Sequence, residues 1–251
     1  MRHALVTGGG KGLGKAVATR LLADGFVVTV TGRDAAALAS VVALDESRIG
    51  SVIGDVGYEA DVAAMIGAAI DARGPVDVLV NNAGIGESAP IARTTLEQWE
   101  RHLRVNATGV FLCSRAVLAS MTERGWGRIV TVASAASHVG WPYTAAYTAG
   151  KHAALGFMRV LAAEIRESGV TANCVCPGYV RTEMTERTLE RVRVTTGRSA
   201  EEAEAAVLRA ANQRRLVEPE EVAGAVAYLV SDGAAAINGQ SLVIDGGGVQ
   251  H

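Results

Sequence analysis

The feature that most constrains the fold is a repeated alternation between short apolar runs and longer stretches with helical spacing. HALVTG, FVVTVTG, IGSVIGDV, VDVLVNNAG, GRIVTVAS and VTANCVCPG are almost continuously apolar, and a stretch of helical character follows each of them. Strands of this kind are buried on both faces, and an intervening helix forces successive strands to run parallel. The pattern predicts an α/β fold in which residues 1–251 form one domain, a doubly wound parallel sheet with helices on both faces.

Four further segments complete the expected architecture. QSLVIDGG is expected to add a last strand, and residues 95–124 and 147–168 are each expected to form a long helix. Residues 181–216 are charged and helical in pattern, and they are inserted between the sixth strand and the helix in PEEVAGAVAYLVS. An insertion just beyond the carboxyl end of a strand is typical of a lid that covers a substrate. A plain surface helical hairpin fits the same residues equally well.

Composition and charge argue against nucleic acid and membranes as partners and against secretion. Of the 251 residues, 49% are hydrophobic and 20% are charged, and the net charge of −2 gives no electrostatic reason to expect nucleic acid or an anionic membrane. No apolar run approaches the ~18 residues of a spanning helix, and the start MRHALVTGGG is not a secretory signal. We therefore expect a cytoplasmic protein.

The three cysteines do not suggest a disulfide framework or a metal site. Their number is odd, so they cannot all pair with one another. Cys174 and Cys176 are expected on opposite faces of a strand rather than on a metal ion. No bound metal is expected.

The turn after the first apolar run has the composition of a phosphate-binding loop. In VTGGGKGLG, Gly8, Gly12 and Gly14 form the pattern G-x-x-x-G-x-G between a strand and a helix. Glycines there permit a tight turn and let backbone N–H groups approach a pyrophosphate at the helix N-terminus. This position favours a Rossmann dinucleotide site, whose other loop residues would be Gly10, Lys11 and Leu13.

The end of the second apolar run indicates which dinucleotide is bound. NAD-binding proteins usually place an acidic residue there for the ribose 2′-hydroxyl, but this chain has Gly32 and Arg33. A guanidinium matches a 2′-phosphate, and Lys11 would add a second positive charge. Asp34 is the rival candidate as a ribose ligand, although a role as helix N-cap explains it as well. We favour NADP(H) over NAD(H).

Tyr147 and Lys151 form the candidate chemical pair. The chain has only three lysines, and one of them follows a tyrosine by one helical turn. A free phenol has a pKa near ~10, too high for efficient proton exchange at neutral pH. An ammonium at about 4 Å in an effective dielectric of ~20 would favour the phenolate by roughly 4 kcal/mol, or about 3 pKa units. We therefore expect Lys151 to lower the pKa of Tyr147.

With these residues in view, the chain resembles the short-chain dehydrogenase/reductase family along nearly its whole length. NNAG at 81–84, VNATGVF at 105–111, TVASAAS, Tyr-x-x-x-Lys, CPG at 176–178 and IDGG at 244–247 follow the glycine motif in family order and spacing. Several stretches, including ERGWGRIV and GVTANCVCPGYVRTEM, are most similar to 3-oxoacyl thioester reductases and aromatic polyketide ketoreductases. The residues after NNAG are IGESAP, without the glycine-rich run of some polyketide ketoreductases.

The resemblance implies a role for each motif residue. Tyr147 would be the general acid in reduction, Ser134 would polarise the substrate carbonyl, and Lys151 would grip the nicotinamide ribose. Asn106 would hold a water that links Lys151 to solvent. The remaining cofactor-binding residues implied are Asp55, Val56, Asn82, Ala83, Gly84, Pro177, Gly178, Val180 and Thr182.

The substrate side is less well defined by motif. Ser134, Ala136, Trp141, Tyr143 and Met184 are the candidate substrate-contacting residues. Glu87 and Ser88, which follow NNAG, are also expected to face the pocket. His138 and His152 occupy no catalytic position of the family, so we do not assign them acid–base roles.

Three functions remain open at this point. The first is an NADPH-dependent reductase of a ketone, most simply a 3-oxoacyl thioester carried by coenzyme A or acyl carrier protein. The second is an NAD-dependent dehydrogenase of a small cyclic or aromatic secondary alcohol. The third is a non-catalytic dinucleotide sensor, against which the intact serine, tyrosine and lysine set argues.

The resemblance also implies a homotetramer built on the apolar helices of residues 95–124 and 147–168 and on the C-terminal strand. For an acyl carrier protein, only Arg101, Arg104 and Arg115 offer a basic contribution, and they form no evident cluster.

Overall fold

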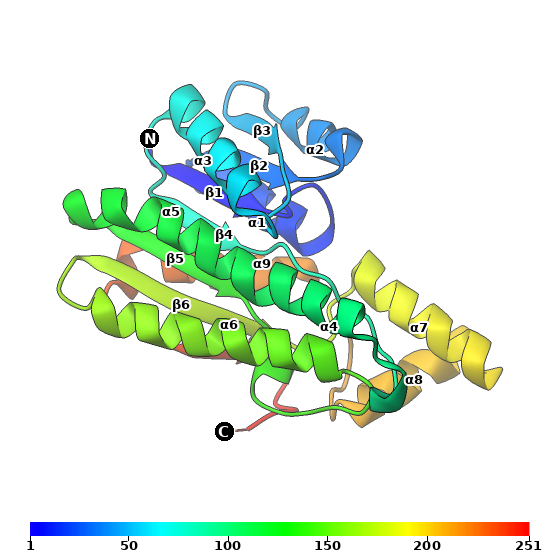
Figure 1. Ribbon diagram of the computed structural model, residues 1–251. Coiled ribbons are helices and arrows are strands. Elements are labelled where there is room, and N and C mark those ends of the chain that lie inside the picture. Colours follow the sequence, from blue (N-terminus) through cyan, green and yellow to red (C-terminus); the bar gives the residue numbers. More distant parts are fainter. Residues whose placement is uncertain (251) are drawn as a thin grey trace.

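A seven-stranded parallel sheet forms the centre of the computed structural model, which describes residues 1–250 (Figure 1). Its strand order is β3-β2-β1-β4-β5-β6-β7, and every neighbouring pair is parallel. The strands are β1 His3–Thr7, β2 Val27–Gly32, β3 Ile49–Ile53, β4 Val78–Asn81, β5 Gly127–Val132, β6 Val170–Pro177 and β7 Ser241–Ile244. The predicted doubly wound α/β fold is confirmed.

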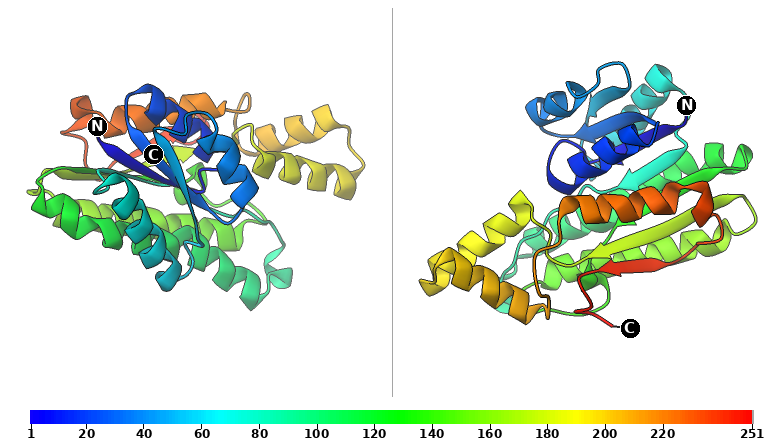
Figure 2. Two further views of the ribbon diagram at one scale, coloured as in Figure 1. Left: turned by 90° about the horizontal axis from the view of Figure 1, so that it is seen from above. Right: turned by 180° about the vertical axis from the view of Figure 1, so that it is seen from behind.

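Helices cover both faces of this sheet (Figure 2). The α-helices are α1 Gly12–Ala23, α2 Ala35–Val42, α3 Glu59–Arg73, α4 Leu96–Leu103, α5 Gly109–Glu123, α6 Ala145–Glu164, α7 Glu183–Thr196, α8 Ala200–Ala210 and α9 Pro219–Val230. Helices α1, α2 and α9 enclose one apolar core against the sheet, and α3, α5 and α6 enclose the other. The inner strands β1, β2, β4, β5 and β6 are therefore buried on both sides, whereas the edge strands β3 and β7 are partly exposed.

The two strand cysteines lie on the same face of β6. Cys174 and Cys176 both enter the core with α3, α5 and α6, whereas Val175 between them enters the opposite core. The prediction that they lie on opposite faces is wrong, because side chains two residues apart in a strand point the same way. Burial raises the pKa of the Cys176 thiol to about 11, so this thiol is protonated at neutral pH.

The predicted helical region over residues 95–124 is confirmed, and a π turn interrupts its regular α-helical hydrogen bonding. Helix α4 ends at Leu103, five residues in π-helical conformation follow at Arg104–Thr108, and α5 begins at Gly109. The N–H of Gly109 bonds to the carbonyl of Arg104, five residues earlier. Such π turns insert one residue into a helix and often occur at functional sites. This one holds Asn106, whose side chain is completely buried.

Residues 181–216, here called the lid segment, form a pair of packed helices that projects beyond the carboxyl ends of the strands (Figures 1 and 2). Helix α7 ends at Gly197, which has a left-handed backbone with φ of 70°, and a capping box between Ser199 and Glu202 starts α8. A β-bridge between Val180 and Val217 closes the base of the segment. The segment is thus anchored at both ends beside β6.

The strand order places a binding crevice at the carboxyl ends of the central strands β1 and β4. The chain reverses direction of winding between β1 and β4, which are neighbours although two strands separate them in sequence. Ligands of open α/β sheets bind outside the carboxyl ends of the strands at such a point. The glycine loop follows β1, and Asn82 to Gly84 follow β4.

Residues 1–250 hold neither a membrane-spanning helix nor a cluster of metal-binding side chains. None of their helices has the length and apolar character needed to cross a membrane. They also contain no group of three or more His, Cys, Asp or Glu side chains placed to hold a metal ion.

Candidate active site

A groove of about 640 Å³ runs along this crevice and brings together most of the predicted cofactor-binding residues. The predicted residues that line it are Gly8, Lys11, Gly12, Leu13, Gly14, Arg33, Asn82, Ala83, Gly84, Tyr147, Lys151, Pro177, Gly178, Val180 and Thr182. They come from four strand ends and three helix starts. The fold therefore assembles motifs that are up to 174 residues apart in the sequence (182 minus 8).

The glycine loop has the geometry of a phosphate cradle. Gly8 and Gly12 have φ values of 64° and 49°, which side-chain-bearing residues rarely adopt. A Cβ atom at Gly14 would lie 2.2 Å from the carbonyl oxygen of Gly8, so only glycine permits this close turn. No side chain caps the start of α1, which leaves its first N–H groups directed at the groove. These features fit a dinucleotide diphosphate.

Two cations mark the end of the groove beside β2. Lys11 Nζ lies 2.7 Å from Asp34 Oδ2, and Arg33 Nη1 lies 3.4 Å from Asp55 Oδ2. The Arg33 side chain is 70% exposed, so its guanidinium is free to turn toward a ligand. Asp34 also caps α2 by accepting a hydrogen bond from the N–H of Ala37, which confirms its predicted structural role.

Three predicted cofactor residues lie outside the lining of this groove. Gly10 packs against α2, where an added Cβ would lie 3.1 Å from Ala37 Cβ. Asp55 accepts a hydrogen bond from the Gly57 N–H and pairs with Arg33. Val56 is buried in the core beside Gly109. These three residues support the groove wall or its charges from behind.

Ser134 and Tyr147 meet where the groove opens into a second cavity. Ser134 follows β5 and caps a short 3₁₀ turn, with its Oγ accepting the N–H of Ala136 at 3.1 Å. Partial burial raises the pKa of the Tyr147 phenol, and a hydrogen bond with the Ser134 hydroxyl acts in the opposite direction. The phenol is therefore protonated at neutral pH and can donate a proton.

Lys151 lies one turn further along α6 and is 6% exposed. Its Nζ donates a hydrogen bond of 2.8 Å to the carbonyl of Val132 and lies 5.9 Å from the centroid of the Tyr147 ring. Burial lowers the pKa of this ammonium to about 8. The predicted net fall in the pKa of Tyr147 is not found, because burial of the phenol raises this pKa and outweighs the groups that favour the phenolate.

Asn106 anchors the turn after β4 from behind. Its Oδ1 accepts the N–H of Ile85 at 3.0 Å, and its Nδ2 donates to the carbonyl of the same residue at 2.9 Å. A Cβ at Gly84 would lie 3.1 Å from Asn106 Oδ1 and 3.5 Å from Lys151 Nζ. The amide thus holds this turn close to the lysine, and the water relay implied for Asn106 stays a prediction.

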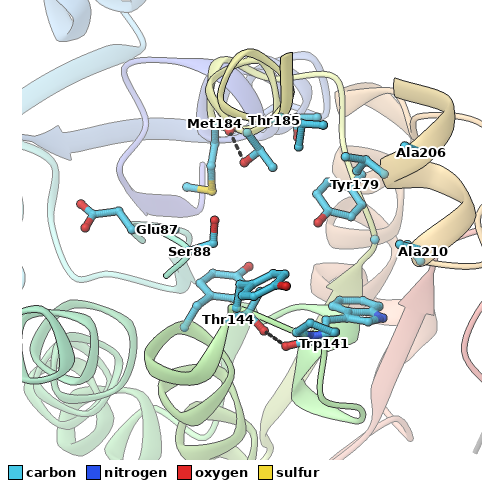
Figure 3. Close-up of a pocket in the computed structure, with 18 of the residues that line it drawn as sticks. Glu87, Ser88, Trp141, Thr144, Tyr179, Met184, Thr185, Ala206 and Ala210 are labelled. Atoms are coloured by element: carbon cyan, nitrogen blue, oxygen red, sulfur yellow. Dashed lines mark hydrogen bonds between the residues drawn. The ribbon is translucent and has the colours of Figure 1, made fainter. Parts of the chain in front are cut away.

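The second cavity, of about 460 Å³, is the candidate substrate pocket. Figure 3 shows Met184 and Thr185 from α7 opposite Trp141 and Thr144, with Tyr179 and α8 residues Ala206 and Ala210 on one side and Ser88 and Glu87 on the other. Ser134 and Tyr147 also line this pocket. The candidate catalytic side chains and both helices of the lid segment therefore line the same space.

Most of the predicted substrate-contacting residues lie in this pocket. Trp141 stacks at a tilt against Tyr179, with ring centroids 6.4 Å apart. Tyr143 is 61% exposed and has a φ of 70°, an unusual conformation for a bulky residue, and its carbonyl accepts the N–H of Ala89 at 2.8 Å. Ala136 is completely buried outside the lining and contributes through its N–H to Ser134. His138 and His152 line neither cavity.

Residues 86–89 connect the pocket to α4 and α7. The buried His102 accepts the N–H of Glu87 on Nε2 at 3.2 Å, and Arg101 forms an ion pair of 2.6 Å with the Glu87 carboxylate. From the lid segment, Arg191 donates to the carbonyl and the hydroxyl of Ser88 at 3.0 and 2.6 Å. These contacts were not predicted, because nothing in the spacing of Arg191 or His102 indicates their partners.

Comparison with known proteins agrees with this geometry. A family model described as "short chain dehydrogenase" matches residues 2–193. The chain belongs to the short-chain dehydrogenase family.

Within the family it is 38% identical over 249 residues to a 3-oxoacyl-[acyl-carrier-protein] reductase of Synechocystis sp., covering 97% of this chain and 95% of the relative. It is 40% identical over 256 residues to a monensin polyketide synthase putative ketoacyl reductase of Streptomyces virginiae, covering 98% and 96%. A crystal structure of an actinorhodin polyketide ketoreductase variant with NADPH superposes with a TM-score of 0.95 at 36% identity, covering 100% of this chain and 98% of the other.

Proposed function

We propose that this short-chain dehydrogenase reduces a ketone to a secondary alcohol with NADPH, and that its substrate is a 3-oxoacyl thioester or a related polyketide ketone. The observation that carries the proposal is the convergence of Ser134 and Tyr147 at the junction of a dinucleotide groove and a pocket lined by α7 and α8. The two relatives named above, a 3-oxoacyl-[acyl-carrier-protein] reductase and a putative ketoacyl reductase, support a 3-oxoacyl ketone as the substrate.

The groove fits a nicotinamide dinucleotide, which supplies a hydride to the carbonyl carbon when bound. The uncapped start of α1 would hold its diphosphate, and Lys11 and Arg33 would hold a 2′-phosphate. An acidic residue that could accept the 2′-hydroxyl is absent from positions 32 and 33, which favours NADPH over NADH. The NADPH in the actinorhodin relative is consistent with this preference.

The protein's own residues perform the acid chemistry. Tyr147 Oη donates its proton to the carbonyl oxygen as the carbon is reduced, and the Ser134 hydroxyl donates a hydrogen bond to the same oxygen. The Lys151 ammonium then stabilises the phenolate that proton donation leaves behind. The phenolate regains its proton from solvent.

The acyl carrier, the assembly and the compartment form the outer part of the proposal. Of the arginines considered for a carrier protein, Arg101 and Arg115 already pair with Glu87 and Glu59, so coenzyme A thioesters are the simpler first substrates. Phe111 on α5 and Val160 on α6 are 39% and 57% exposed, which supports burial of these helices in a homotetramer. A solution mass measurement tests the tetramer. We retain the cytoplasm as the proposed compartment.

The direct test follows nicotinamide absorbance with purified protein, acetoacetyl-CoA and either NADPH or NADH. We expect turnover with NADPH, much weaker turnover with NADH, and a loss of at least about 10²-fold in Tyr147→Phe, which keeps the ring but not the proton. Absence of turnover with both cofactors would exclude the acyl-thioester substrate, and cyclic ketones and secondary alcohols would be tested next.

A further inference from the structure

Two arginines of the lid segment face the nucleotide groove. Arg187 and Arg191, both on α7, line it together with Lys11 from the glycine loop and Arg33 from the end of β2. The dinucleotide-binding motifs account for the last two cations but not for the first two. Helix α7 therefore brings positive charge to the cofactor groove from the side opposite the sheet.

Of the two, Arg187 is the one placed near the glycine loop. Helix α7 starts immediately after Thr182, whose Cγ2 atom would lie 3.5 Å from a Cβ at Gly12. Hydrogen bonding to Asp34 raises the pKa of Lys11, and the charge of Arg187 opposes this effect to a smaller extent. Arg187 and Lys11 line the same groove, and an anion bound between them would reduce the repulsion between their charges.

The negative charge of NADPH exceeds the positive charge that Lys11 and Arg33 supply, so a further cation at the ligand would be favourable. NADPH carries about four negative charges, two on the diphosphate and nearly two on the 2′-phosphate. Lys11 and Arg33 together supply only two positive charges, and each also lies beside an aspartate. Arg187 pairs with Glu183 one turn earlier on the same helix, and both side chains are more than half exposed. Exposed pairs of this kind are weak, so the guanidinium can exchange Glu183 for a phosphate.

We propose that Arg187 binds a phosphate group of the dinucleotide, which makes α7 part of the cofactor site as well as a wall of the substrate pocket. This inference rests on the proposed function for the identity of the ligand. Arg187 exchanges its ion pair with Glu183 for a charge-assisted contact with the phosphate. Cofactor binding and the position of α7 are coupled through that contact.

The test is the Kd of NADPH and of NADH, measured by calorimetry without substrate, for the wild type, Arg187→Met and Arg193→Met. Arg193 is the matched control, because it lies on the same helix, pairs with Glu190 and faces away from the groove. We expect Arg187→Met to weaken binding about tenfold and Arg193→Met less than about twofold. Loss with both dinucleotides identifies the diphosphate, and loss with NADPH alone identifies the 2′-phosphate.

Glu183→Gln supplies an effect of opposite sign. Removal of the competing carboxylate should tighten binding about threefold, and most of this gain should disappear in the Glu183→Gln, Arg187→Met double variant. Equal affinities for Arg187→Met and Arg193→Met would overturn the inference but would not count against the proposed reductase function. Failure of the wild type to bind either dinucleotide would overturn the inference and the proposed function together.

Discussion

At the scale of single residues, burial shifts the pKa values of Lys151 and Tyr147 in opposite directions. The pKa of Lys151 falls to about 8 and that of Tyr147 rises, so both are protonated at neutral pH. We expect kcat/KM with respect to NADPH, which reports the free enzyme, to stay level from about pH 6 to 7 and to fall as the pH rises through about 8. The reason is that a neutral amine cannot stabilise the phenolate. Lys151→Arg keeps its charge and should lose this fall, whatever its absolute rate; a wild-type profile that is flat through pH 9 would contradict the assignment.

At the scale of elements, the contact between Arg191 and Ser88 holds α7 against the turn that follows β4. We expect Arg191→Met to raise the KM for the ketone about three- to tenfold with a smaller change in kcat, since the contact orders the lid segment without touching the reacting atoms. Cleavage of the segment by a glutamate-specific protease should also become several-fold faster. Arg193→Met, on the outer side of the same helix, should leave both unchanged. Equal cleavage rates in the two variants would show that the contact does not restrain α7.

At the scale of the whole molecule, His3 links folding to pH. It is 1% exposed, with Nδ1 2.9 Å from the carbonyl of Gly74 and Nε2 2.8 Å from Thr29 Oγ1. Burial is the main cause that lowers the pKa of His3 below 6.5. Its contribution is therefore fully present above about pH 6.5 and is lost as the pH falls below that value, with a slope of at most about 1.4 kcal/mol per pH unit. We expect Tm to fall between pH 7 and pH 5 more steeply in the wild type than in His3→Gln; identical slopes would exclude this role.

Across the whole molecule, features with a local sequence pattern were predictable, whereas long-range contacts and burial were not. The sheet, the glycine loop and the pair of Tyr147 and Lys151 were predictable, because apolar runs and residues one helical turn apart express local geometry. The π turn at Arg104–Thr108 was not, since one inserted residue leaves the helical pattern of its neighbours intact. Arg191 reaches Ser88 across 103 residues, and no local spacing encodes such a contact. The pKa of Tyr147 depends on how deeply the phenol is buried, which only the folded chain determines.

In the proposed reaction the dinucleotide gives a hydride to a ketone carbon while Tyr147 donates the proton to its oxygen. The most direct measurement is mass spectrometry and NMR of the product formed from acetoacetyl-CoA and NADPH deuterated at the transferred position. We expect one deuterium on the alcohol carbon of each product molecule, and we expect Tyr147→Phe to form this labelled product only at its residual rate. An alcohol product without deuterium at that carbon, or equal label transfer by the tyrosine variant, would contradict the proposed reaction.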